Sequence, residues 1–328
     1  MIDFWAAALG LMLLMYVLLD GFDLGVGMLF GIAPHEAARR QMMRVIAPVW
    51  DGNETWLVLT ATILFGAFPH VYALLLSAFY LPLLVMLAAI ILRGVAFEFR
   101  YKSIGLRHVW DLGFAGGSVL IAFVQGAAIG ALVQELPVRG GQYVGGAFGW
   151  FSPFAILCGL GLVFGYALLG AAWLCAKTEG EVRDLGYRYL PRLLAAVLVF
   201  LLLAFTYAIG LDLRVLHRWS ERPAMMTFPA IGLAASTVLA VAIRRRYDGA
   251  LYPMGMLIFG SAFGTLVASF LPYMVPFSVT IDQAAAPHAS LAFLFWGAGV
   301  VVLPITLIYT AVVYRVFRGK IDPETNYL

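Results

Sequence analysis

The chain has 328 residues, of which 63% are hydrophobic and 12% are charged, and its formal net charge is +3. Soluble domains contain roughly half apolar and about a quarter charged residues, so this composition excludes an ordinary soluble fold. Because so much apolar surface requires an apolar solvent, we expect one all-α integral membrane domain over residues 1–328. The N-terminus lacks the basic region and cleavage site of a signal peptide, so it is expected to be a retained span.

Hydropathy and helix breakers predict nine membrane spans, each of roughly 20 residues. The predicted spans are 4–30, 53–69, 71–97, 112–134, 150–176, 190–210, 224–243, 253–273 and 290–317. The second span has the weakest signal, because it is short and opens in polar sequence. We expect residues 1–137 and 150–273 to form two four-helix groups, with 290–317 as a peripheral ninth helix.

The basic residues predict the orientation of these spans. Most of the 21 lysines and arginines fall on one side of the predicted topology, namely Arg39, Arg40, Arg44, Arg100, Lys102, Arg107, Lys177, Arg183, Arg188, Arg192, Arg244, Arg245, Arg246, Arg315, Arg318 and Lys320. The other side carries Arg139, Arg214, Arg218 and Arg222, and Arg93 lies within the third span. The positive-inside rule places the basic side in the cytoplasm. The N-terminus is then outside and the C-terminus is cytoplasmic, as an odd number of spans requires.

Two carboxylates lie within the first predicted span, in the segment LLDGFDLGVG. Asp20 and Asp23 are three residues apart, so they share one face of a helix. Intramembrane acids are costly and usually functional, and such a pair can pass protons. The alternative is a structural pair, satisfied by Arg93 or by backbone donors. The glycines of this segment allow another helix to approach closely.

The second polar run, APVWDGNETWLVL, opens the second span. One interpretation is helix capping, with Asp51 as the N-cap, Glu54 reaching back to it, and Trp50 and Trp56 in an interfacial aromatic belt. The other interpretation is a polar inlet, in which Asp51, Asn53 and Glu54 hold water at the cytoplasmic mouth and feed protons inward. The sequence leaves both open.

The third polar run, LRGVAFEFRYK, closes the third span. Arg93 is expected either to extend its guanidinium to the interface or to pair with Asp23, and Glu98 is a further ion-pair candidate. Gln125, in the fourth span, is a weaker candidate that could bond to neighbouring helices. The tripled arginine 244–246 indicates a topology anchor or an anionic lipid contact.

The histidine pattern argues against haem or metal held by this chain alone. Membrane haem proteins need His or Met axial ligands inside the bundle. The five histidines, His35, His70, His108, His217 and His288, all fall in predicted loops or at span ends. Methionine in a membrane helix is ordinarily a packing residue. No phosphate-binding loop, dinucleotide fingerprint, Ser-His-Asp arrangement or nucleic-acid signal is present.

The three polar runs together resemble a known family. LDGFDLGVG, WDGNETWLV and RGVAFEFRYK, in this order at the ends of the first three spans, are similar to subunit II of cytochrome bd-type quinol oxidases. FLPYMVP near the end of the eighth span and VLPITLIYT in the last span extend the resemblance over nearly the whole chain. The first three motifs are the specific ones.

The resemblance implies a respiratory membrane complex of the bacterial inner membrane that oxidises quinol and reduces oxygen to water. It implies that haems b and d, or b only, are bound by a larger subunit I. This chain would then support subunit I and help deliver cytoplasmic protons, with Asp51 and Asp23 matching the proton-path acids of the family. Small single-span subunits and a structural quinone are further expected partners.

One departure from the family pattern concerns the connection around 274–289, which reads SVTIDQAAAPH and lacks a polar run. This suggests the cyanide-insensitive branch of the family. Two other functions also fit membrane acids. A secondary transporter would use them for proton coupling, although such sites usually lie near the bilayer midplane. A purely structural scaffold would use them as caps and ion pairs.

Overall fold

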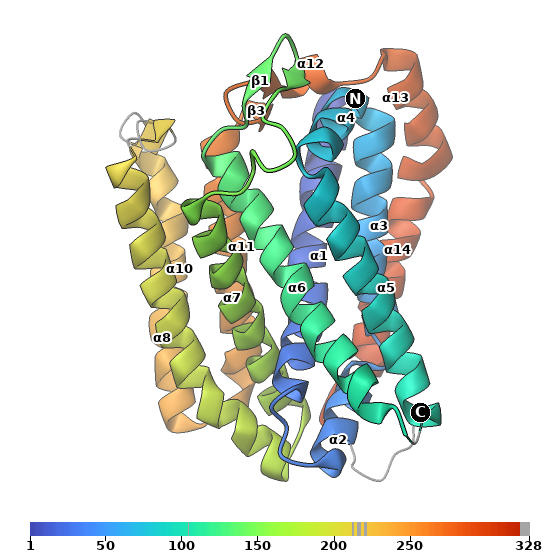
Figure 1. Ribbon diagram of the computed structural model, residues 1–328, viewed down its shortest axis with the longest axis vertical. Coiled ribbons are helices and arrows are strands. Elements are labelled where there is room, and N and C mark those ends of the chain that lie inside the picture. The colour runs from blue at the N-terminus through green and yellow to red at the C-terminus, as the bar shows by residue number, and fades with distance from the viewer. Residues whose placement is uncertain (104, 212, 215–217, 220–221, 322–328) are drawn as a thin grey trace.

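The computed structural model describes residues 1–103, 105–211, 213–214, 218–219 and 222–321. Within these ranges helices dominate, and strands form two short antiparallel hairpins. Most helices run side by side between two ends of one bundle (Figure 1). The prediction of an all-α membrane architecture is confirmed.

The first half of the chain forms the following elements: α1 (Ile2–Phe30), α2 (Glu36–Ile46), α3 (Trp50–Ala67), α4 (Pro69–Ala78), α5 (Tyr80–Lys102), α6 (Arg107–Val133), β1 (Val138–Arg139), β2 (Gln142–Tyr143) and α7 (Pro153–Lys177). The second half forms α8 (Gly180–Gly210), the 3₁₀-helix η1 (Pro223–Met226), α10 (Thr227–Arg245), α11 (Asp248–Phe270), β3 (Tyr273–Val275), β4 (Val279–Thr280), α12 (Ile281–Ala284), α13 (His288–Leu294), the π-helical turn η2 (Phe295–Gly299) and α14 (Val302–Val316).

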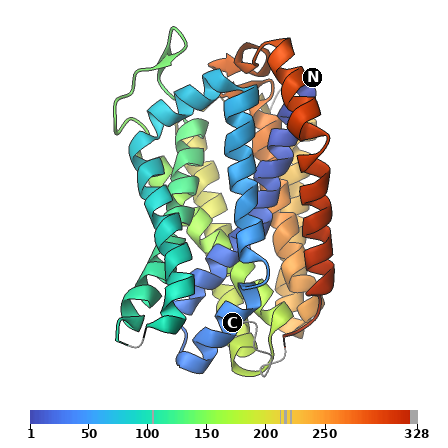
Figure 2. The same cartoon turned by 90° about the vertical axis from the view of Figure 1, so that its right-hand side faces the viewer.

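The predicted number of spans agrees with these elements. In the described ranges, eight helical segments are long and apolar enough to cross a membrane, and the bent pair α3–α4 brings the number to nine. Helix α3 packs against α1. Figure 2 shows α3 running along the bundle while the chain turns sideways into α4. The weak second span is therefore a helix of the bundle.

The boundary between the second and third spans differs from the prediction. Residues 71–97 were expected to form one span, but α4 is a separate short helix and α5 begins at Tyr80. The axes of α3 and α4 differ by 119°. Pro69 explains the bend between α3 and α4, because proline has no N–H to continue α3 and restricts the preceding residue. Phe68 accordingly leaves the helical region, at φ −134° and ψ 57°. The break between α4 and α5 that the prediction missed lies at Phe79.

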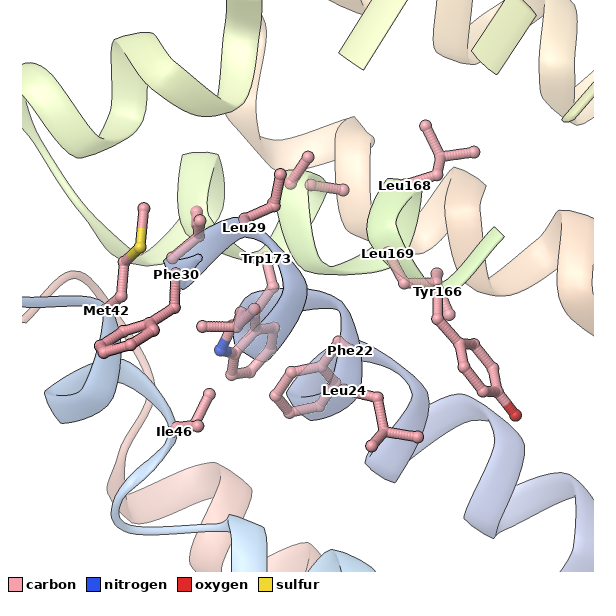
Figure 3. Packing of buried hydrophobic residues seen from close by; sticks show 14 of the residues in the cluster. Phe22, Leu24, Leu29, Phe30, Met42, Ile46, Tyr166, Leu168, Leu169 and Trp173 are labelled. Carbon is pink, nitrogen blue, oxygen red and sulfur yellow. The ribbon is translucent and has the colours of Figure 1, made fainter. Parts of the chain in front are cut away.

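The centre of the bundle is a close contact between α1 and α7. The segment from Leu19 to Gly27 in α1 is buried at every position. A Cβ atom on Gly25 would overlap the carbonyl oxygen of Tyr166, so only glycine lets the two backbones meet here. Beside this contact Phe22 stacks on Trp173, with ring centroids 4.1 Å apart (Figure 3).

The remaining helices surround this pair. Helix α1 also contacts α3 and α6, and α7 contacts α6, α8 and α11, while α10 lies against α8 and α11. Helices α7, α8, α10 and α11 thus form one four-helix ring. The division of the chain into 1–137, 150–273 and 290–317 stays a prediction, as does the side of the membrane that each end faces.

The glycine contact predicts a specific intolerance in α1. Gly25→Ala should destabilise the protein by about 1–3 kcal/mol, because the added methyl group forces α1 away from α7. Gly10→Ala is the matched control in the same helix, since nothing lies within 4 Å of a Cβ at Gly10. The measurement is the midpoint of thermal unfolding in detergent. Equal midpoints for the two variants would contradict the role given to this contact.

Candidate functional site

Arg93 of α5 lies at the centre of a buried ionic cluster. Its side chain is 2% exposed, and its Nη1 atom is 3.7 Å from Oδ1 of Asp20 on α1 and 3.7 Å from Oε2 of Glu54 on α3. Both distances are ion-pair distances that exceed hydrogen-bond length. One guanidinium therefore joins acids from two other helices.

Asp23, one turn after Asp20 on α1, is hydrogen-bonded to the side-chain amide of Asn53. Asn53 Nδ2 donates hydrogen bonds to Oδ2 of Asp23 at 2.7 Å and to the carbonyl oxygen of Leu19 at 3.3 Å. The Tyr314 hydroxyl donates to Oδ1 of Asn53 at 3.0 Å, which ties α14 to α1 and α3. We call Asp20, Asp23, Asn53, Glu54 and Arg93 the Arg93 cluster.

A ladder of hydroxyl and amide groups extends from this cluster toward α6 and α7. Tyr16 lies beside Asp20 on α1. Gln125 Nε2 donates to the Tyr16 hydroxyl at 2.6 Å, and the Tyr166 hydroxyl donates to Gln125 Oε1 at 3.0 Å. Gln125 thus bonds to neighbouring helices, as expected.

The cluster keeps hydrogen-bonding capacity that the described residues do not use. Within those residues, Oδ1 of Asp20, Oδ1 of Asp23, and Nε and Nη2 of Arg93 are buried without a hydrogen-bond partner. In native proteins nearly all buried polar atoms are hydrogen-bonded, to protein or to ordered water. The two carboxylate oxygens can therefore take up a proton or bind water, and the two guanidinium nitrogens can bind water, without first breaking an existing hydrogen bond.

The capping interpretation of the second polar run is wrong. Helix α3 begins at Trp50, two residues earlier than an N-cap at Asp51 requires, so its N-cap is Val49, which makes no side-chain cap. Asp51 lies in the first turn and is exposed, where a carboxylate still interacts favourably with the helix dipole. Trp56 is fully buried rather than in an interfacial belt, and Trp50 packs on Phe97.

The two interpretations of Arg93 are also resolved by this geometry. Arg93 does not extend to the interface, since its side chain is enclosed. Its ion-pair partners are Asp20 and Glu54, whereas Asp23 bonds to Asn53. Sequence spacing placed Arg93 at the correct depth but did not identify these partners. Glu98 is exposed on α5 and lies outside the cluster.

A second ionic cluster lies at the end of the bundle where α2 is found, and the sequence reasoning missed it (Figure 1). Arg100 of α5 has a side chain that is 1% exposed. Its Nη1 and Nη2 atoms donate to both carboxylate oxygens of Glu36 at 3.1 and 2.6 Å, and its Nε donates to Asp111. Arg39 also donates to Asp111, at 2.9 Å.

Burial tends to raise the pKa of Glu36, but hydrogen bonds from Arg100 and Arg40 lower this pKa to about 2. In the sequence, Glu36 and Asp111 fall in predicted connections between spans, where a single carboxylate is usually a solvated surface residue. The only sequence signal was Arg100 itself, about two helical turns from Arg93 on a largely apolar helix. This second cluster fastens α2 and α6 to α5.

Because Arg100 is enclosed, Arg100→Gln should destabilise the protein by about 1.5–3 kcal/mol, as it removes the charge-assisted hydrogen bonds to Glu36 and Asp111 and leaves these carboxylates only Arg40 and Arg39 as close cationic partners. Arg107→Gln is the control: its Nη1 is 3.7 Å from Glu36 and its side chain is 34% exposed, so its loss should have little effect. Thermal unfolding of both variants is the measurement. A larger effect at Arg107 than at Arg100 would overturn this assignment.

The lowered pKa of Glu36 predicts a stability change with pH. A carboxylate whose folded pKa is depressed stabilises the folded state above its ordinary pKa of 4.5 and loses that contribution as the pH falls toward about 2. Glu36→Gln should therefore be less stable than the wild type at pH 6, and the difference should shrink between pH 4.5 and 2. Unfolding midpoints of both proteins across this range test the prediction, and a constant difference would contradict it.

The described histidines lie at helix ends. His35 is the N-cap of α2, His70, His108 and His288 lie in the first turns of α4, α6 and α13, and His217 lies outside the described residues. In the described ranges, no group of three or more His, Cys, Asp or Glu side chains is arranged to hold a metal ion.

Comparisons with known proteins find similar sequences among oxidase subunits. The chain is 30% identical over 361 residues to "Cytochrome bd-I ubiquinol oxidase subunit 2" of Escherichia coli K12, an alignment that covers 98% of this chain and 95% of that protein. It is 28% identical to "Cytochrome bd ubiquinol oxidase subunit 2" of Bacillus subtilis 168, covering 98% and 96%.

The fold is also that of a solved oxidase. The bd oxidase from Geobacillus thermodenitrificans matches with a TM-score of 0.78 at 16% identity, over 96% of this chain and 98% of that chain. The family model for cytochrome bd terminal oxidase subunit II matches residues 1–317. With its eight or more apolar helices, this is a multi-pass protein of the bacterial inner membrane. The chain belongs to the cytochrome bd terminal oxidase subunit II family.

Proposed function

We propose that this chain is the haem-free subunit of a quinol oxidase, and that it supports a haem-bearing subunit I and delivers cytoplasmic protons toward its oxygen-reducing site. The observation that carries the proposal is the composition of the Arg93 cluster. This cluster holds three carboxyl groups and one guanidinium within the membrane-spanning part of the bundle: Asp20 and Glu54 pair with Arg93, and Asp23 lies one turn along α1, bonded to Asn53.

The excess of carboxyl groups favours proton storage. If all three acids were ionised, the cluster would carry two uncompensated negative charges in surroundings of low dielectric. Isolated buried charges are strongly unfavourable, so the cluster is more stable when it holds protons. A group of acids that shares protons inside a membrane is the usual basis of a proton relay.

The acids also form a series from surface to interior. Asp51 is exposed at the start of α3, Glu54 follows one turn later with a side chain that is 21% exposed, and Asp20 is buried behind it. A proton that enters at Asp51 would pass to Glu54 and then to Asp20, with Arg93 between the last two. Asp23 and Asn53 form a side branch that stabilises this arrangement.

In this proposal the redox chemistry belongs to subunit I, which would carry haems b and d, or b only, and oxidise the quinol. Oxygen reduction consumes protons, and protons taken from the cytoplasm contribute to the proton motive force. Small single-span subunits, lipid and a structural quinone would complete the complex. This chain would be inactive alone.

Glu54→Gln and Asp20→Asn test the relay in the co-expressed complex. Each should slow quinol-driven oxygen consumption by roughly a hundredfold, the lower end of the usual contribution of a positioned proton-transfer group. Asp51→Asn should act in the same direction. Glu98→Gln is the matched control, an exposed acid on α5 outside the cluster, and should leave turnover unchanged.

Proton-uptake kinetics and haem spectra separate a relay from a scaffold. The relay predicts slower proton uptake with normal haem absorption. Unchanged uptake with normal haem absorption in the Glu54 and Asp20 variants would sink the relay and favour a structural role. Substrate uptake by this chain alone in vesicles would instead support a transporter.

A further inference from the structure

A surface cavity of about 460 Å³ lies between the start of α8 and the end of α10, far along the chain from the Arg93 cluster. Its size is within the range of roughly 300–1,000 Å³ typical of small-ligand sites. The cavity is lined by Asp184, Tyr187, Arg188, Ile243, Arg244 and Arg246. Three of these six residues are arginines and one is an acid, so the lining has a net positive charge.

Two of the three arginines are free to bind an anion. Arg246 is engaged, since its Nη2 is 3.1 Å from Asp184 Oδ1 and its guanidinium lies 5.0 Å from the centre of the Tyr187 ring. Arg188 and Arg244 make no ion pair or hydrogen bond with any residue in the described part of the chain. Asp184 is thus neutralised internally, and two cations face the cavity without a partner.

The backbone at the end of α10 maintains this arrangement. Arg246 ends the helix in the left-handed conformation, at φ 50° and ψ 44°, which is uncommon for a residue other than glycine. This turn directs Arg246 to Asp184 and Tyr187, while Arg244 remains in the last helical turn. Tyr187 is itself fixed by the bond from its hydroxyl to Asp248 at 2.6 Å.

The surroundings of the cavity indicate which kind of anion it takes. Both helices continue from it as exposed apolar surface, with Val199 and Leu202 on α8 and Val238 and Val241 on α10. A ligand with a phosphate and acyl chains satisfies the charged and the apolar parts together. The positive-inside rule puts this end at the cytoplasmic leaflet, whose anionic lipids attract arginines.

We propose that the α8–α10 cavity binds the phosphate of an anionic phospholipid, with Arg188 and Arg244 as its ligands and the acyl chains lying along α8 and α10. The proposal is independent of proton delivery, because the cavity shares no residue with the Arg93 cluster. It assigns a lipid-binding role to the four-helix ring of α7, α8, α10 and α11.

Binding of dioleoyl phosphatidylglycerol to the detergent-purified protein, with the chains that co-purify with it, tests this by native mass spectrometry. Arg244→Gln should weaken binding about fivefold and the double variant Arg188→Gln/Arg244→Gln about thirtyfold, on the usual contribution of an arginine near an anionic membrane surface. Arg245→Gln is the matched control, because it removes the same charge from the next residue but does not line the cavity.

Three results would overturn the proposal. Equal weakening by Arg244→Gln and Arg245→Gln would indicate general surface charge rather than a site. Equally tight binding of neutral dioleoyl phosphatidylcholine would remove the role of the headgroup charge. Thermal stabilisation by inorganic phosphate as large as that by the lipid would identify a free anion as the occupant. Normal haem absorption of the single variants checks their folding.

Discussion

The position of Arg93 between acids on two other helices is the constraint on which the first half of this structure depends. A guanidinium enclosed in a membrane bundle is stable only with anionic partners close by. Asp20 and Glu54 supply them, each at 3.7 Å, and so fix the relative depth of α1, α3 and α5. Asn53 then adds α14 through Tyr314. Helices far apart in the sequence are held in register by one charge.

The two buried arginines of α5 differ in a way that bears on function. Arg100 makes hydrogen bonds to both oxygens of Glu36 and to Asp111, so its donors are largely used. Arg93 has longer contacts and two unused nitrogen atoms. A saturated cluster is rigid, whereas an unsaturated one can change its protonation or bind water without breaking bonds. The same residue type therefore attaches helices at one end of α5, and nearer its middle, in the proposed relay, it holds the acids that would carry the protons.

Much of the fold could be predicted from the sequence, because membrane spans are encoded locally by hydropathy. The nine spans have structural counterparts, and the sequence offered an ion pair between Arg93 and the first span, whereas the contact of Arg93 with Glu54 in the second polar run was not predicted. The local signal failed at α4, where an apolar run hid the break between α4 and α5 at Phe79. The sequence also did not identify the N-cap residue of α3, since a carboxylate near the start of a helix fits the cap position and the first turn equally well.

Partners of individual side chains could not be predicted, because they depend on how helices rotate against one another. The sequence offered both Asp20 and Asp23 as partners of Arg93, and the arrangement of α1 relative to α3 and α5 brings Asp20 to the arginine and Asp23 to Asn53. Glu36 and Asp111 were missed for the same reason, since only the packing of α2 and α6 brings them to Arg100.

The arrangement separates two tasks within one chain. The acids lie on α1, α3 and α5, and the arginine-lined cavity lies between α8 and α10. Helix α7 packs against both α1 and α8 and so connects the two regions. Among the described residues, its polar link toward the Arg93 cluster is the hydrogen bond from Tyr166 to Gln125. A lipid bound at α8 and α10 would therefore stabilise the ring that supports α1 and leave the protonation of its acids unaffected.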